Sequence, residues 1–227
     1  MILALFFTRA TSLQTWLDRG LFDREKLIYE YHLSIGNLKE VHWLTYGGED
    51  EALARKLKID GRLDPRIYVH GRPRWIPSGK FGLTLYSLLL PLINQKVLKF
   101  ANVYKSNQLD GAWAAVFARY IFRKPLVLRC GYVQSQLETS LRRLPAWRLK
   151  LMLAIERFQY LHTDLAVVAS VHNARYIRAC HNVSECRIRV LPNYIDEVLF
   201  APNPKSSSET RQERLLYVGR LSLEKKP

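Results

Sequence analysis

The chain has 227 residues, of which 48% are hydrophobic and 24% are charged. This composition can bury a sizeable core and excludes a chain that is disordered in bulk. Its 35 lysine and arginine residues against 20 acidic residues give a formal net charge of +15, which indicates an anionic partner: nucleic acid, a phospholipid surface or a phosphorylated substrate. The three cysteines lack a close C-x-x-C spacing, which argues against a disulfide framework and against a metal site, and suggests a reducing compartment.

Short apolar runs alternate with helical segments along the first 200 residues. These runs predict seven strands, at Ile2–Phe7, Glu40–Tyr46, Ile67–Val69, Ala101–Tyr104, Pro125–Cys130, Leu165–Ser170 and Arg187–Leu191. The runs are nearly continuous rather than alternating, which is typical of parallel strands that are buried on both faces. The sequence therefore predicts an α/β fold, with a Rossmann-like parallel sheet and helices on both faces.

Apolar spacing also predicts which side of each helix faces the core. The segment Phe81–Leu98 is a helix that Pro91 should kink or split. A later helix, opened by Asp110-Gly111, carries a stripe that should face the core, made of Trp113, Val116, Phe117, Tyr120 and Ile121. A long helix ending near His162 should bury a second stripe, made of Leu144, Trp147, Leu151, Ala154 or Ile155, Phe158 and Leu161. Ser170 would either cap the helix that follows the sixth strand or, at the carboxyl end of that strand, face the cleft.

Polar residues follow the fourth and fifth predicted strands. Asn107 and Gln108 lie in the loop at the carboxyl end of one strand, and Arg129 and Tyr132 lie at the carboxyl end of the next. Ligands of open parallel sheets bind at the carboxyl ends of the strands. We therefore expect these four residues to border a ligand.

Two segments combine tryptophan with basic residues. One contains Arg72, Arg74, Trp75 and Lys80, and the other contains Arg142, Arg143, Trp147 and Arg148. This composition is typical of contacts with a membrane interface, although ordinary interdomain loops share it. We expect an anionic membrane surface rather than nucleic acid as the partner.

The apolar segments also bear on where the protein acts. The longest apolar tract, Gly82–Ile93, is too short to cross a bilayer. No basic region precedes the apolar N-terminus, so we expect no signal peptide. We therefore expect a cytoplasmic protein, peripheral on the inner face of the membrane.

The C-terminal residues resemble a known family. The stretches VLPNYIDEVLF (190–200) and LLYVGRLSLEK (215–225) closely resemble the domain junction of family-4 glycosyltransferases, which are retaining enzymes of GT-B architecture. Tyr194 stands where many members of that family have glycine. The stretch that begins TRATSL (8–13) resembles the acceptor-side loop of a surface-polysaccharide subgroup, and RCGY (129–132) resembles an R-x-G-Y element of the same subgroup.

This resemblance implies a division of the chain into three parts. Residues 1–200 would be the acceptor-binding domain, the N-terminal half of a GT-B fold. Residues 201–213 would be a linker, and residues 214–227 would be the first strand and loop of a truncated nucleotide-sugar-binding domain. By resemblance, Arg220 and Lys225 contact the donor diphosphate, and Thr8, Ser12, Trp16 and Gly20 border the acceptor. The alternative for Trp16 is that it only packs its loop onto the domain.

The implied reaction is transfer of a hexose, with retention, from a nucleotide sugar to a lipid-linked or polysaccharide acceptor. No metal or other cofactor is expected, and no catalytic residue is assigned, because the family's paired glutamates have no counterpart before the sequence stops. The chain alone should be inactive, and a separate chain that supplies the second domain is one alternative. The rival function is a non-catalytic basic module that binds an anionic membrane or the acceptor.

Overall fold

The structure, a computed structural model, describes residues 1–141, 144–195 and 201. Met1–Tyr194 forms one compact unit. The predicted linker and the predicted start of a second domain lie almost entirely outside the described residues, as do Arg142, Arg143, Arg220 and Lys225.

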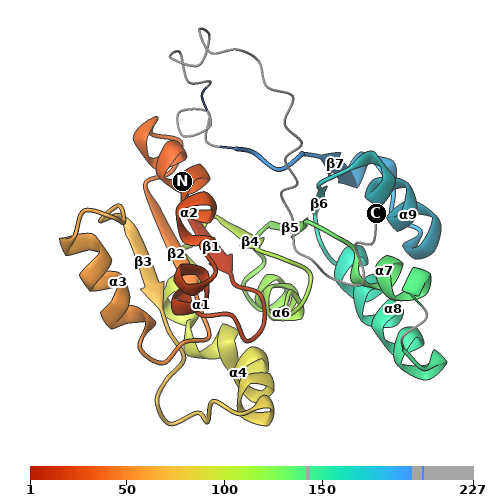
Figure 1. Cartoon of the computed structure of the whole chain (residues 1–227), viewed down its shortest axis with the longest axis horizontal. Helices are drawn as coiled ribbons and strands as arrows, with labels where there is room; N and C mark the ends of the chain where they lie inside the picture. The colour runs from red at the N-terminus through yellow and green to blue at the C-terminus, as the bar shows by residue number, and fades with distance from the viewer. Residues whose placement is uncertain (142–143, 196–200, 202–227) are drawn as a thin grey trace, which may run out of the picture. The chain divides into compact units, whose positions relative to one another are not determined.

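The unit is built on a seven-stranded sheet in which every neighbouring pair is parallel (Figure 1). The strands are β1 (Ile2–Phe6), β2 (Glu40–Leu44), β3 (Ile67–His70), β4 (Val103–Ser106), β5 (Leu126–Cys130), β6 (Leu165–Val168) and β7 (Ile188–Val190), in the order β3-β2-β1-β4-β5-β6-β7. The predicted α/β class, the parallel sheet and the seven strands are confirmed.

Helices connect each strand to the next. They are α1 (Leu13–Asp18), α2 (Phe22–Ser34), α3 (Asp50–Ile59), α4 (Lys80–Ile93), α5 (Gln95–Phe100), α6 (Trp113–Phe122), α7 (Gln134–Leu141), α8 (Ala146–Leu161) and α9 (Val171–His181), with a 3₁₀ turn at Glu185–Arg187. The predicted segment is divided into two helices, but α4 runs through Pro91 to Ile93 and the division lies at Asn94. Ser170 caps α9 by accepting from the backbone N–H of Asn173 at 3.2 Å, which is one of its two predicted roles.

The helices cover the two faces of the sheet unequally. On one face, here called the α2 face, Trp16 of α1 and Tyr29 of α2 contact Trp43 of β2. On the other, the α6 face, Tyr104 of β4 donates a hydrogen bond to the carbonyl of Leu98 in α5 at 2.7 Å. Right-handed crossovers explain this distribution, because the chain moves one way from β1 to β3 and the other way from β4 to β7.

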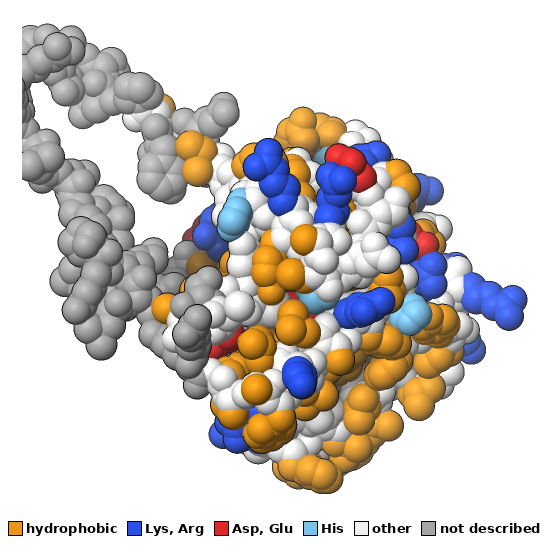
Figure 2. Space-filling model, turned by 90° about the vertical axis from the view of Figure 1, so that its right-hand side faces the viewer, with side chains coloured by type: hydrophobic (Ala, Val, Ile, Leu, Met, Phe, Trp, Pro, Cys, Tyr) orange, Lys and Arg blue, Asp and Glu red, His pale blue; other side chains and the backbone are white. Residues whose placement is uncertain are grey.

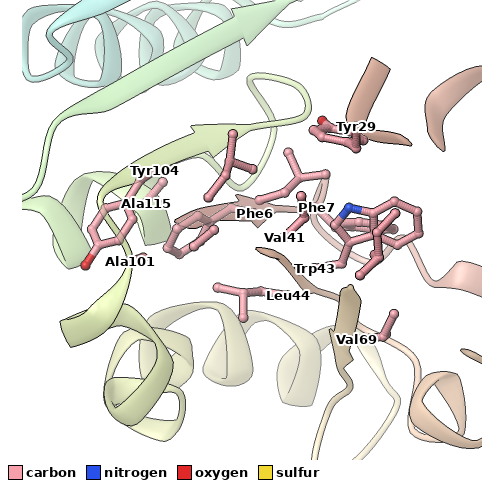
Figure 3. Packing of buried hydrophobic residues seen from close by; sticks show 14 of the residues in the cluster. Phe6, Phe7, Tyr29, Val41, Trp43, Leu44, Val69, Ala101, Tyr104 and Ala115 are labelled. Carbon is pink, nitrogen blue, oxygen red and sulfur yellow. The ribbon is translucent and has the colours of Figure 1, made fainter. Parts of the chain in front are cut away.

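Buried side chains of the larger core cluster lie on both sides of β1, an inner strand of the sheet. Figure 3 shows Phe6 and Tyr104 on the side of β1 away from Phe7 and Trp43. The rings of Phe6 and Tyr104 lie 5.6 Å apart in an edge-to-face arrangement, which is a favourable geometry for aromatic pairs. β1 is therefore packed by buried side chains on both of its faces.

The predicted core stripe of α6 is wrong in part. Val116 is buried, but Tyr120 and Ile121 are exposed. The alanines of the helix, Ala114, Ala115 and Ala118, face the core instead. Their small side chains let α4 approach α6 closely, and this helix pair cannot be inferred from the sequence of α6 alone.

The predicted core stripe of α8 is also wrong in part, although Phe158 packs against the core as predicted. Trp147, Leu151 and Ile155 are exposed, whereas Glu156, Gln159 and Tyr160 are buried. The reason is a buried polar network that requires the Glu156 carboxylate to face inwards. Two short helices, α1 and α7, were not predicted. In α1, Ser12 and Thr15 form a capping box that stabilises a helix too short to show apolar periodicity.

Candidate functional site

The carboxyl edge of the sheet has a crevice where the chain direction changes. β1 lies between β2 and β4, and the connection after β1 runs towards β2 whereas the connection after β4 runs towards β5. The two loops therefore leave the sheet in opposite directions. Such a switch point is where open α/β sheets bind their ligands.

The loops after β1 and β4 are joined at this point by a hydrogen bond and an ion pair. The backbone N–H of Arg9 donates to the carbonyl of Asp110 at 3.0 Å, and Arg9 Nε lies 3.2 Å from Asp110 Oδ1. Gly111 has a φ of +88°, and a Cβ at this position would lie 2.8 Å from the backbone nitrogen of Arg9. Glycine is therefore required for the close approach of the two loops.

A cavity of about 290 Å³ opens beside this contact. Arg9, Asp110 and Trp113 form one wall, and the other walls are made by Leu109, Gln134, Met152, Ile155, Glu156 and Gln159. The Arg9 guanidinium carbon lies 5.8 Å from the centre of the Trp113 ring. An aromatic face beside a cation and a carboxylate can hold a small ligand that has both an apolar side and hydroxyl groups.

Buried hydrogen bonds fix the position of Glu156. Its carboxylate accepts from the backbone N–H of Ser135 at 3.1 Å and from the Ser135 hydroxyl at 2.5 Å. His181 Nε2 lies 3.3 Å from the same carboxylate. The three residues come from α7, α8 and α9, and all are buried. The network thus holds three helices together behind the cavity.

A second cluster lies on the α2 face near the ends of β4 and β5. Lys105 Nζ donates to Tyr29 Oη at 2.6 Å. Burial, together with the neighbouring Arg129 charge, lowers the pKa of Lys105 to about 7, and Glu25 opposes this shift. Arg129 lies 3.6 Å from a Glu25 carboxylate oxygen and donates to Asn193 Oδ1 at 3.1 Å. Arg129 therefore joins α2 to the segment that follows β7.

The eight predicted acceptor residues fall into two groups along the carboxyl edge. After β1, Thr8 is half-buried, Ser12 caps α1, and Gly20 is exposed in a turn. Trp16 is only 2% exposed and stacks on Phe7 with their ring centres 4.0 Å apart, which corresponds to the packing alternative.

The other four lie after β4 and β5. Asn107 is buried with no hydrogen-bond partner for Oδ1 in the described structure, and Gln108 accepts from the backbone N–H of Gly131 at 2.9 Å. Tyr132 is exposed, and Arg129 forms the contacts given above. None of the eight is among the residues that line the 290 Å³ cavity. Their role at an acceptor stays a prediction.

Sequence reasoning missed the cavity's own residues. Arg9 and Asp110 lie one or two positions beyond predicted site residues, so the rule about strand ends would have found them if applied further along each loop. Trp113 was assigned to the core and is half-buried, with one part packed inwards and another facing the cavity. The residues from α7 and α8 carried no sequence signal.

The predicted membrane residues vary in exposure. Trp75 is 68% exposed, Lys80 is exposed, and Arg74 pairs with Glu49 at 3.0 Å. Arg72 is half-buried. Trp147 is exposed, and the Arg148 guanidinium lies 5.1 Å from its ring centre.

Comparison with known proteins adds a structural likeness. No protein-family model and no curated protein sequence matches the chain. Anabaena HepE in complex with UDP matches with a TM-score of 0.54 and 13% identity over 90% of this chain and 47% of HepE. A Listeria monocytogenes protein named as a UDP-N-acetylglucosamine 2-epimerase matches with a TM-score of 0.53 and 13% identity, over 85% of this chain and 44% of that one.

A third solved structure is Glycyrrhiza uralensis UGT73P12 complexed with glycyrrhetinic acid 3-O-monoglucuronide. It gives a TM-score of 0.54 and 10% identity, over 84% of this chain and 48% of that one. The chain thus spans about half the length of each of these proteins. At such low identity the likeness concerns the fold alone. The described unit has the fold of one half of a GT-B protein.

Proposed function

We propose that the chain is the acceptor-binding half of a retaining glycosyltransferase related to family 4. The cavity at the switch point, between the loops after β1 and β4, carries this proposal. The resemblance of residues 190–200 and 215–225 to a domain junction of that family supports it, and so does the half-GT-B fold. HepE, which shares this fold, binds UDP, which is consistent with a nucleotide-sugar donor.

In this proposal the two halves of the enzyme divide the work. Residues 1–200 bind a lipid-linked or polysaccharide acceptor, residues 201–213 link the domains, and residues 214–227 begin the nucleotide-sugar domain. Arg220 and Lys225 neutralise the leaving diphosphate. The remainder of the second domain comes from further polypeptide, in the same chain or in a separate one. The enzyme works at the cytoplasmic face of a membrane.

The cavity offers suitable groups for one sugar ring. Trp113 presents an aromatic face to the apolar C–H side of the ring. Asp110 accepts hydrogen bonds from hydroxyl groups, and Arg9 donates to ring or hydroxyl oxygens. Because Arg9 and Asp110 also pair with each other, their side chains are already held in place before the acceptor binds.

Replacing Trp113 with alanine should weaken binding of an alkyl glycoside about tenfold, because the ring loses its stacking surface. The measurement is saturation-transfer NMR titration of the chain with octyl β-D-glucoside. Tyr120→Ala is the matched control, because Tyr120 is an exposed aromatic residue two turns further along the same helix. Equal binding by the Trp113→Ala variant and the wild type would contradict the assignment of the cavity.

Catalysis itself separates the enzyme from a non-catalytic module. Sugar transfer from a nucleotide donor should require both this chain and a polypeptide that supplies the second domain. A complete complex that binds acceptor and donor but transfers no sugar would favour the binding module.

We also propose that the acceptor-binding half contacts an anionic membrane. No helix of the described residues is long and apolar enough to cross a bilayer. However, α4 exposes Phe81, Leu88 and Leu92, and α8 exposes Trp147 and Leu151. Both helices lie on the lower side of the view in Figure 1, and Figure 2 shows hydrophobic side chains gathered on the lower part of the molecule. Ile155 of the α8 stripe also lines the cavity, so a lipid-linked acceptor could reach it from the membrane surface.

Replacing Trp147 with glutamate should lower binding to anionic vesicles about tenfold, because the change removes an apolar anchor and adds charge repulsion. The measurement is co-sedimentation with phosphatidylglycerol vesicles. Tyr31→Glu is the control, since Tyr31 is an exposed aromatic residue on α2. If both variants bind vesicles alike, α8 is not a membrane contact.

A further inference from the structure

A second cavity, of about 510 Å³, opens at the carboxyl ends of β2 and β3. Its walls come from the loops after these two strands, from the first two turns of α3 and from the end of α4. β3 is an edge strand of the sheet, and Figure 1 shows α3 beside it. No residue of this cavity, here called the β3 cavity, lines the cavity at the switch point. The proposed acceptor site therefore leaves it without a role.

The two loops that form the β3 cavity pack backbone against backbone. The N–H of Arg72 donates to the carbonyl of Gly47 at 3.0 Å. A Cβ at Gly71 would clash with the Gly47 carbonyl oxygen, so the close approach of the loops requires glycine there. The Arg72 guanidinium lies against Gly48, where a Cβ would be 3.4 Å from Nη2. The wall that carries Arg72 is therefore built before any ligand binds.

Three arginines line the cavity, and two of them have no acidic partner among the described residues. Arg74 pairs with Glu49 at 3.0 Å. Arg55 and Arg72 form no ion pair with a carboxylate in the part of the chain that the structure describes. Arg72 Nε is buried without a hydrogen-bond partner, and Nη1 donates to the carbonyl of Pro73 at 3.4 Å. The cavity therefore presents two guanidinium groups whose charge is not neutralised.

Hydrogen-bond acceptors and a neutral ring lie beside these arginines. The Glu51 carboxylate lines the cavity and accepts from the backbone N–H of Gly71 at 3.3 Å through one of its oxygens. Burial, together with the neighbouring His42, lowers the pKa of His70 to about 4, so the His70 ring in the cavity wall is neutral near neutral pH. A phosphate alone needs donors, whereas sugar hydroxyl groups need acceptors as well. The lining thus suits a ligand that carries both an anionic group and hydroxyl groups.

We propose that the β3 cavity binds an acidic sugar residue, one that carries a carboxylate. Arg55 and Arg72 pair with the carboxylate, because guanidinium groups match carboxylates in geometry and charge. Glu51 and His70 bind the hydroxyl groups.

A phospholipid headgroup is the rival occupant of the β3 cavity. An acyl chain attached to it would need an apolar path out of the cavity. The exposed apolar residues of α4, which include Phe81, Leu88 and Leu92, are not among the lining residues. The lining therefore favours the sugar.

The acidic sugar belongs to the acceptor, so this inference rests on the proposed function. The loop after β1 lies between the two cavities. One part of it is joined to the loop after β4, and the carbonyl of Thr11 accepts from the backbone N–H of Tyr46, after β2, at 3.2 Å. Neighbouring strands are about 4.8 Å apart, so the ends of β1 and β3 are about 10 Å apart. An oligosaccharide would cross this loop, which carries Thr8 and Ser12, with its reacting sugar at the switch point and an acidic sugar in the β3 cavity.

The test is an amide NMR titration of the 227-residue chain with methyl β-D-glucuronide and, separately, with its neutral counterpart methyl β-D-glucoside. We expect saturable shifts of the Gly48, Gly71 and Arg72 amides with the glucuronide. The glucoside should bind at least about tenfold more weakly, because it lacks the charge that the arginines recognise.

Arg55→Gln and Arg72→Gln should each weaken glucuronide binding about tenfold, since each change removes one charged donor. Lys56→Gln is the matched control and should bind like the wild type. Lys56 is exposed, follows Arg55 on α3 and does not line the cavity, so it reports the effect of net charge alone. Arg55 is also exposed, so its variant decides the question if Arg72→Gln fails to fold.

Two results would overturn the inference. One is equal glucuronide binding by Arg55→Gln and Lys56→Gln. The other is tighter binding of dihexanoyl phosphatidylglycerol than of the glucuronide, lost in Arg55→Gln, which would assign the cavity to a membrane lipid.

Octyl β-D-glucoside titration of the same samples separates this inference from the proposed function. A wild type that binds octyl β-D-glucoside but not the glucuronide counts against the acidic-sugar site alone. A wild type that binds the glucuronide at the Gly48 and Gly71 amides but not octyl β-D-glucoside supports the β3 cavity and counts against the cavity at the switch point.

Discussion

Replacing Trp16 with alanine should lower the free energy of unfolding by about 3–5 kcal/mol, the usual cost of truncating a large buried aromatic side chain. Trp16 is 2% exposed, its ring stacks on Phe7 with 4.0 Å between centres, and it meets Trp43 edge to face at 5.4 Å. The alanine variant would leave a cavity between α1 and the central strands. Urea denaturation followed by circular dichroism measures the change.

The matched control is Trp75→Ala. Trp75 is 68% exposed, so its loss should change stability by no more than about 0.5 kcal/mol. The comparison also decides between the two roles considered for Trp16. A Trp16→Ala variant as stable as the wild type that no longer binds octyl β-D-glucoside would show that Trp16 serves the acceptor rather than the core.

Replacing Glu156 with alanine should lower the free energy of unfolding by about 3–5 kcal/mol, as is typical when one partner of a buried charged network is removed. The Ser135 hydroxyl and backbone N–H would lose their acceptor, and His181 would lose its carboxylate neighbour. Because these groups come from three helices, the loss should loosen α7, α8 and α9 together. Hydrogen exchange, which reports local opening, should show faster exchange in all three.

Glu185→Ala provides the control for this second change. Glu185 is exposed and pairs with Arg178 at 3.1 Å, and such surface pairs contribute about 0–1 kcal/mol. Glu156→Gln keeps one acceptor oxygen for Ser135, so its free energy of unfolding should lie between those of the control and Glu156→Ala. If Glu156→Ala proves as stable as Glu185→Ala, the buried network does not hold these helices together.

The seven strands and their parallel pairing follow from local sequence patterns. Each of the seven strands contains a short, mostly apolar run, most complete in Ile2–Phe6, and the helices between the strands allow parallel pairing. A strand buried on both faces needs apolar residues at every position, and this requirement is local enough to read from one segment. The Ser170 cap is equally local, because its hydroxyl acts within one helical turn.

Which side of a helix faces inwards, and where the cavity lies, depends instead on contacts between distant segments. In α8, Glu156 is buried and Leu151 is exposed, against the apolar pattern, because the partners of Glu156 are 21 and 25 residues away in the sequence. In α6, alanines replace aromatics at the contact with α4. The wall of the cavity joins Arg9 to Asp110, 101 residues later. Contacts between distant segments depend on how the crossovers stack the elements, and no single stretch of sequence carries that information.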